Sequence, residues 1–233
     1  TDLFVHFEMV PDRFPEALRK LVKEFPPGSL QLEIGVQSLN PVVGRLISRR
    51  QDVLKLEDNL RYLREETNAH LHVDLIVGLP GESLQSFGLG FDRLIALNPQ
   101  EIQIGILKRL RGTPIVRHST EYQLKFSDTP PYEILETKDV TFDEIQRMER
   151  FARYWDLIGN SGNFRESRSY LWQEGGSAFS EFLALSDWLH EALGQRSSIQ
   201  LKKLMAAVFK YFVSEKKFSA SSIGAVLARD YAR

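Results

Sequence analysis

Cysteine is absent from the 233 residues of this sequence. Its absence excludes disulfide bonds, thiolate catalysis and cysteine-ligated zinc or iron–sulfur clusters from these residues. The sequence also lacks an apolar run of the roughly 20 residues that a membrane-spanning helix needs, and it opens without a hydrophobic leader. We therefore expect a cytoplasmic protein without a membrane partner.

An excess of charge of one sign is missing as well, since 30 Lys and Arg face 31 Asp and Glu. Dedicated nucleic-acid binders need basic surfaces to neutralise phosphates, so a nucleic-acid partner is not favoured. Residues 193–233 are the exception, because they hold eight Lys and Arg against two Asp and Glu. A hydrophobic fraction of 42% and a charged fraction of 26% indicate a folded chain rather than a disordered one.

Short apolar runs alternate with helical patterns in the first half of the chain. Alternation of this kind indicates βαβ units, and therefore a parallel sheet or barrel of the α/β class. We expect the first and last of these strands at the two edges of the sheet. The predicted strands are residues 3–8, 30–36, 71–77 and 101–107.

Several residues are of the types that begin helices. Asn40 and Ser83 precede the second and fourth helical patterns and are predicted to cap them. Asp12 is predicted to cap the first helix, which would place Phe14, Leu18, Leu21 and Val22 on one buried face.

The second half of the chain has a different character. Residues 108–140 lack clean periodicity and are predicted to be mostly irregular. The capping box TFDE at residues 141–144 predicts the start of a helix. Further helices are predicted at residues 177–192, 198–213 and 219–231.

Each predicted strand alternates apolar with polar side chains, although buried parallel strands are normally apolar throughout. A helix-covered flat sheet would hide these polar groups only at a cost of several kcal/mol for an unpaired carboxylate. A barrel around a ligand-filled cavity is therefore favoured, and a merely solvated inner face is the alternative. In such barrels the chemistry lies at the carboxyl ends of the strands. The polar positions are Glu8, Glu33, Gln37, His72, Asp74 and Gln103.

The segment LHVDLIVGLPGES at residues 71–83 reads as a strand, a Gly/Pro turn and a capped helix. Its glycines allow a ligand to approach the backbone closely, and the free amides of the helix start can receive an anion. A well-formed βα turn that binds nothing explains the same pattern equally well.

Four segments, in this order, resemble motifs of radical S-adenosylmethionine enzymes. DLIVGLPGE at residues 74–82 resembles the fifth-strand motif, and LEIGVQSL at residues 32–39 resembles the fourth-strand motif. HFEM at residues 6–9 is similar to the third strand, and IGILKRLRGTP at residues 104–114 is similar to the sixth.

A finer resemblance is to the branch of this superfamily that carries an N-terminal cobalamin-binding domain. A subgroup of that branch has a C-terminal domain of unknown function. PPYEIL at residues 130–135 and NSGNF at residues 160–164 resemble that domain.

The resemblance implies a set of cofactor-binding residues but no catalytic residue and no metal ligand in this chain. Glu33 and Gln37 would face S-adenosylmethionine, and an ion pair of Glu33 with Arg45 or Lys108 is the alternative. Backbone atoms of Ile76 and Gly78 would lie near its adenine. The full implied set is Glu8, Glu33, Gln37, Asp74, Ile76, Gly78, Leu107 and Lys108.

The Cys-x3-Cys-x2-Cys cluster motif of the family is absent, so we expect a C-terminal fragment that is inactive alone and binds no cofactor. Residues 1–118 would form the C-terminal half of a (β/α)6 barrel. Residues 119–165 would form an irregular linker and a helix, and residues 166–233 a helical C-terminal region. The upstream part of the same protein would complete the barrel.

The full-length enzyme would bind S-adenosylmethionine and a [4Fe–4S] cluster, with cobalamin in the finer resemblance. It would perform radical chemistry or methyl transfer on a small-molecule substrate that the sequence does not identify. The basic residues Lys108, Arg109, Arg111 and Arg117 would bind an anionic group of that substrate or form a solvated loop. The alternative function is a non-catalytic interaction module whose basic helical tail binds protein or nucleic acid. Exposed sheet edges also predict self-association.

Overall fold

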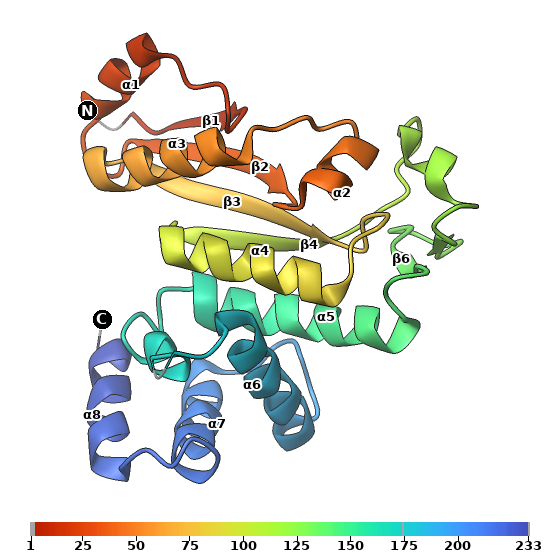
Figure 1. The fold of residues 1–233 in the computed structure, drawn as a ribbon. Coiled ribbons are helices and arrows are strands. Elements are labelled where there is room, and N and C mark those ends of the chain that lie inside the picture. Colours follow the sequence, from red (N-terminus) through yellow and green to blue (C-terminus); the bar gives the residue numbers. More distant parts are fainter. Residues whose placement is uncertain (1–2, 174, 233) are drawn as a thin grey trace. The chain divides into compact units, whose positions relative to one another are not determined.

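The computed structural model describes residues 3–173 and 175–232. The chain divides into two compact units, of which the first ends at Ile145 and the second begins at Gln146. The first unit alternates strands with helices, and the second is helical (Figure 1). No helix within the described ranges is long and apolar enough to cross a membrane.

Four parallel strands form the main sheet of the first unit, in the order β1-β2-β3-β4. The predicted parallel sheet is confirmed, and so are the positions of the first and last strands at its edges. Because all four strands run in one direction, their carboxyl ends meet at the same edge of the sheet. The strands are β1 (Val5–Met9), β2 (Leu30–Gln37), β3 (His70–Val77) and β4 (Glu101–Ile106).

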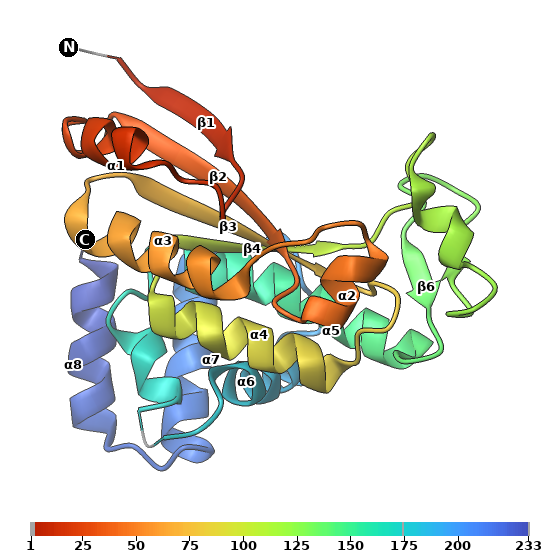
Figure 2. The same cartoon turned by 45° about the horizontal axis from the view of Figure 1, so that its top comes forward.

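One face of this sheet is apolar and is covered by helices. α3 and α4 lie side by side against it in both views (Figure 1, Figure 2). Ile34 and Val73 from the strands and Leu60 and Phe91 from the helices are almost completely buried there. The helices of this part are α1 (Glu16–Lys23), α2 (Pro41–Leu46), α3 (Val53–Glu66) and α4 (Leu84–Leu97).

Two of the three predicted caps in this unit are confirmed. The Asn40 side chain accepts a hydrogen bond from the Val42 amide at 2.9 Å, with Pro41 at the first helical position. The Ser83 hydroxyl accepts from the Ser86 amide at 3.2 Å. Both caps are local in sequence, which explains why the pattern predicted them.

The prediction for the first helix is wrong at its start, and of its predicted apolar face Val22 is buried whereas Leu18 and Leu21 are not. α1 begins at Glu16, and the Asp12 carboxylate instead accepts a hydrogen bond from the Asp52 amide at 3.0 Å. Leu18 and Leu21 are 45% and 50% exposed. α1 lies beside β1, which is the outer strand of the sheet among the described residues. Because no further strand of the described chain continues the sheet there, these two leucines have no apolar surface to pack against.

The region predicted to be irregular contains short regular elements. A 3-10 helix spans Pro114–His118, and β5 (Lys125–Phe126) pairs antiparallel with β6 (Ile134–Glu136). Strands of two and three residues are too short to show a period-two pattern in the sequence. An isolated bridge between Lys108 and Glu133 connects this region with the end of β4.

The second unit is built around aromatic side chains. Phe151, Trp155 and Phe182 are buried, with ring centroids 4.9 to 6.4 Å apart. The Thr141–Glu144 capping box at the start of α5 is confirmed by reciprocal hydrogen bonds. The helices are α5 (Phe142–Trp155), a π-helical turn (Asp156–Asn160), a 3-10 helix (Ser167–Leu171), α6 (Ala178–Leu193), α7 (Leu201–Ser214) and α8 (Ala220–Tyr231).

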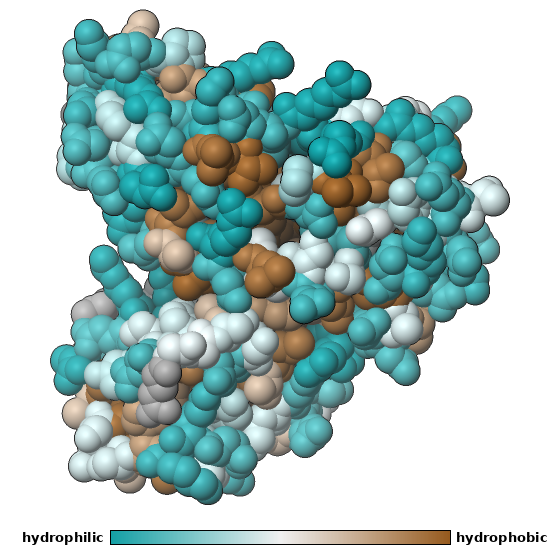
Figure 3. Space-filling model, in the orientation of Figure 1, coloured by the Kyte–Doolittle hydropathy of each residue, from teal (hydrophilic) through white to brown (hydrophobic). Residues whose placement is uncertain are grey.

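Apolar side chains remain exposed around the outer strand β1. Figure 3 shows that hydrophobic patches lie between hydrophilic residues on one face of the molecule. An uncovered strand edge next to exposed apolar side chains favours association between chains. The exposed apolar residues of β1, α1 and the residues beside them are Leu3, Phe4, Phe7, Val10, Leu18 and Leu21.

We expect Phe7→Lys to weaken self-association of the chain, because it places a charge on the edge strand at a side chain that is 53% exposed. Sedimentation velocity over a range of protein concentrations measures the effect. Leu54→Lys is the matched control, since Leu54 is 77% exposed and lies on α3 rather than on a strand. Equal weakening by the two variants, or a wild-type chain that stays monomeric, would show that the β1 edge does not drive association.

Candidate functional site

A cavity of about 330 Å³ lies on the polar face of the sheet, towards the carboxyl ends of β1, β2 and β3. Four of the predicted cofactor-binding residues line it. They come from three separate strands, and parallel pairing brings them together. The lining residues are Glu8, Met9, Val10, Glu33, Gly35, Gln37, Arg49 and Asp74.

The end of β2 is irregular where it borders this cavity. Gly35 pairs with Asp74, but the next paired residue is Gln37, which has a positive φ of 67°. The side chain of Gln37 folds back over Gly35, so that a Cβ atom on Gly35 would lie 2.8 Å from Gln37 Nε2. A side chain at position 35 would therefore displace the Gln37 amide from the cavity wall.

Arg49 is a cavity residue that the sequence analysis missed. Its Nη1 donates a hydrogen bond to the Gly35 carbonyl oxygen at 2.5 Å, and Gln51 Nε2 donates to the same oxygen at 3.2 Å. Arg49 lies in the loop between α2 and α3, where an arginine in the sequence looks like an ordinary solvated residue. Only the folding of that loop over the end of β2 brings Arg49 to the cavity that Glu33 and Asp74 also line.

Glu33 forms a different contact from the ion pairs considered as its alternative role. His6 Nε2 lies 3.1 Å from Glu33 Oε2, and the Glu33 side chain is 37% exposed. Lys108 Nζ instead lies 3.7 Å from Glu133 Oε1. The alternative pairing with Arg45 or Lys108 is therefore wrong, and the Glu33 carboxylate stays accessible at the cavity.

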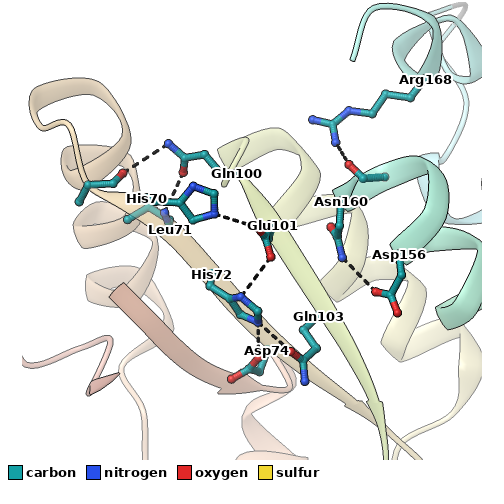
Figure 4. A network of polar contacts seen from close by, with 12 residues as sticks. His70, Leu71, His72, Asp74, Gln100, Glu101, Gln103, Asp156, Asn160 and Arg168 are labelled. Atoms are coloured by element: carbon teal, nitrogen blue, oxygen red, sulfur yellow. Dashed lines mark hydrogen bonds and ion pairs between the residues drawn. The ribbon is translucent and has the colours of Figure 1, made fainter. Parts of the chain in front are cut away.

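A chain of polar contacts crosses from β3 to β4 next to the cavity (Figure 4). His72 Nε2 lies 2.8 Å from Gln103 Oε1 and 3.4 Å from Asp74 Oδ1. On its other side, His72 Nδ1 lies 3.2 Å from Glu101 Oε2, and Glu101 Oε1 lies 2.9 Å from His70 Nε2. These neighbours raise the pKa of His72 to about 9, with the Asp74 carboxylate as the main cause and partial burial opposing it. His72 is therefore cationic at neutral pH and partly balances the charge of Asp74.

Replacement of Asp74 by Asn should lower the pKa of His72 from about 9 towards its ordinary 6.5, because it removes the strongest stabiliser of the imidazolium. The stability that this imidazolium contributes is present below pH 6.5 and is lost as pH rises through 9. NMR titration of the imidazole carbons measures the change, with the exposed Glu65→Gln on α3 as the control. A His72 that still titrates near 9 in the Asn variant would contradict this account.

The remaining predicted cofactor-binding residues do not line this cavity. Gly78 is buried, and a Cβ atom there would lie 2.6 Å from Ile134 Cγ2. Leu107 is buried, and its carbonyl oxygen accepts a hydrogen bond from the Ile134 amide at 2.8 Å. Ile76 is half-buried, and Lys108 pairs with Glu133. Their assignment to the adenine side of a cofactor stays a prediction.

The turn after β3 contains a buried carboxylate that sequence reasoning did not single out. Glu82 is 3% exposed, and its Oε1 accepts a hydrogen bond from the Ser38 hydroxyl at 2.5 Å. Its Oε2 has no hydrogen-bond partner among the described residues. Burial raises the pKa of Glu82 to about 7, although hydrogen bonds from Ser38 and Ser86 partly oppose the rise. The contact joins the turns that follow β2 and β3.

Glu82→Gln should remove part of the pH dependence of folding. Because the folded-state pKa of about 7 lies above the ordinary 4.5, the protonated carboxyl stabilises the fold below pH 4.5, and this contribution is lost as pH rises through 7. We expect the unfolding free energy of the wild-type chain to fall by ~3 kcal/mol more than that of the variant between pH 4.5 and pH 8. Urea unfolding at both pH values measures the difference, and parallel curves for the two proteins would rule it out.

Comparison with known proteins adds two kinds of similarity. Residues 120–233 match the family described as "Protein of unknown function (DUF4080)". A stretch of 77 residues is 35% identical to oxygen-independent coproporphyrinogen III oxidase of Escherichia coli (strain K12) and 34% identical to that of Salmonella typhimurium. These stretches cover 33% of this chain and 17% of each relative, so the chain matches about a sixth of their length.

A solved structure is also similar. It is coproporphyrinogen III oxidase from Escherichia coli, which its title calls a radical SAM enzyme. The TM-score is 0.48 at 24% identity, over 69% of this chain and 33% of that chain. None of these relatives is described as binding cobalamin.

Proposed function

We propose that the first unit supplies part of an S-adenosylmethionine site and that the full-length protein is a radical S-adenosylmethionine enzyme. The observation that carries the proposal is the cavity at the carboxyl ends of β1, β2 and β3. Glu8, Glu33, Gln37 and Asp74 were assigned to one cofactor from separate motifs, and they line one cavity. The 35% identity over 77 residues to a coproporphyrinogen III oxidase supports the same assignment.

The residues of the cavity fit the chemistry of this cofactor. S-adenosylmethionine carries an ammonium group, a sulfonium centre and ribose hydroxyls, all of which suit carboxylates such as those of Glu8, Glu33 and Asp74. Its own carboxylate suits the planar guanidinium of Arg49. The Gln37 amide offers both a donor and an acceptor.

In this proposal the iron–sulfur cluster is bound by residues outside the present sequence, because this chain contains no cysteine. In radical S-adenosylmethionine enzymes the cluster supplies the electron that cleaves the cofactor. We propose accordingly that the isolated chain is inactive. We also propose that the full-length protein binds cobalamin, and this part depends only on the sequence resemblance. A non-catalytic module is less favoured, since such a module has no need for three carboxylates and a guanidinium around one cavity.

We expect Glu33→Ala to weaken S-adenosylmethionine binding by about tenfold, the loss expected for one charge-assisted hydrogen bond. The measurement uses the full-length protein, purified anaerobically and reconstituted with iron and sulfide. Isothermal titration gives the affinity, and 5′-deoxyadenosine formation reports activity. Glu65→Ala removes an exposed carboxylate from α3 and serves as the control. Unchanged affinity in Glu33→Ala, or no 5′-deoxyadenosine from the unaltered protein, would refute the proposal.

A further inference from the structure

A second cavity, of about 350 Å³, lies beside the carboxyl end of β2. Its wall begins with Ser38, directly after that strand, and continues through α2 to the start of α3. Ligands of open parallel sheets bind outside the carboxyl ends of the strands, so this position favours a binding role. The lining residues are Ser38, Asn40, Pro41, Gly44, Arg45, Arg49, Arg50, Gln51, Asp52 and Val53.

Three of these residues are arginines, and the side chains of two of them have no partner in the described chain. The side chains of Arg45 and Arg50 form no hydrogen bond or ion pair within residues 3–173 and 175–232, although the Arg45 backbone carbonyl oxygen accepts from the Ser48 amide at 3.1 Å. The one carboxylate of the wall is already engaged, because Asp52 Oδ1 accepts from the Lys55 amide at 3.2 Å and Oδ2 lies 3.7 Å from Lys55 Nζ. The cavity therefore has an excess of positive charge with unused donors.

The backbone around these arginines is held by specific contacts. The Arg49 amide donates to the Gly44 carbonyl oxygen at 2.7 Å, and a Cβ atom on Gly44 would lie 2.8 Å from the Arg49 carbonyl oxygen. Arg117 Nη2 donates to the Leu46 carbonyl oxygen at 2.8 Å and to Ser48 Oγ at 2.7 Å. Cationic side chains on a backbone held in this way lose less freedom when they bind a ligand.

The basic cluster after β4, which the sequence suggested for an anionic group, is a weaker candidate. Lys108 lies 3.7 Å from Glu133, and Arg109 Nη2 lies 3.8 Å from Asp128 Oδ1. Arg117 is used to hold the α2 loop. Two of the four basic side chains of that cluster are therefore paired with carboxylates, whereas neither Arg45 nor Arg50 forms an ion pair in the described chain.

We propose that the cavity of Arg45, Arg49 and Arg50 binds an anionic oxygen group, a carboxylate or a phosphate, carried on an organic framework. Guanidinium groups bind such planar or tetrahedral anions through paired hydrogen bonds. Pro41 and Val53 give the same wall an apolar part that suits a carbon framework. Arg49 lines this cavity and the first one, so the anion would lie next to the proposed cofactor site. Its identity as a group of the substrate rests on the proposed function.

The test is an NMR titration of the full ¹⁵N-labelled chain with inorganic phosphate and with butyrate, at constant ionic strength. The side-chain Nε–Hε signals of the arginines report binding. We expect saturable shifts of the Arg45 and Arg50 signals with at least one of the two anions, and the anion that binds identifies the class. In the double variant Arg45→Gln, Arg50→Gln we expect binding to weaken by about tenfold or more, as loss of charge-assisted hydrogen bonds requires.

The matched control is Lys20→Gln, Arg61→Gln, which removes the same charge from exposed positions on α1 and α3. Amide spectra verify that both double variants are folded. Equal weakening in the control, or the absence of saturable shifts with either anion, would overturn the proposal. The titration contains no S-adenosylmethionine, so its failure and the failure of the proposed cofactor site are separate results.

Discussion

Parallel pairing of β1, β2 and β3 is the constraint on which the candidate site depends. Parallel strands present equivalent ends at one edge of a sheet. Glu8 and Asp74 are separated by more than sixty residues in the chain, yet the shared strand direction and the pairing register bring both to the wall of one cavity. The polar side chains can stay on their face because the opposite face supplies the apolar burial under α3 and α4. One face of the sheet therefore supplies the buried apolar contacts that stabilise the fold, and the other carries the polar side chains of the cavity.

Charge on the polar face is balanced locally rather than buried without a partner. His6 lies next to Glu33, and His72 lies between Asp74 and Glu101. The imidazolium of His72 places a positive charge between two carboxylates on this face. The guanidinium of Arg49 adds a second positive charge at the wall of the cavity.

Side-chain hydrogen bonds connect the turn that follows β2 with the turn that follows β3. The hydrogen bond from Ser38 to Glu82 joins them, and Asn40 Nδ2 donates to Ser86 Oγ at 2.9 Å. Both contacts run between the segment that begins α2 and the segment that begins α4. These contacts fix the ends of the loops that border the two cavities. The positions of Gln37 and Ser38 therefore depend on the buried carboxylate of Glu82, which lines neither cavity.

The sequence by itself determined the α/β class, the parallel strands, the outer positions of the first and last strands and the polar face of the sheet. These features depend on period-two alternation and on local caps such as Asn40 and Ser83, which short-range patterns encode. It also pointed to Glu8, Glu33, Gln37 and Asp74, whose roles remain proposals. Only the tertiary structure decided that Arg49 joins them, that Glu33 contacts His6, and that Leu18 stays exposed. Those outcomes depend on how a loop folds over a strand end and on what lies beyond an edge strand, and no local pattern in the chain carries that information.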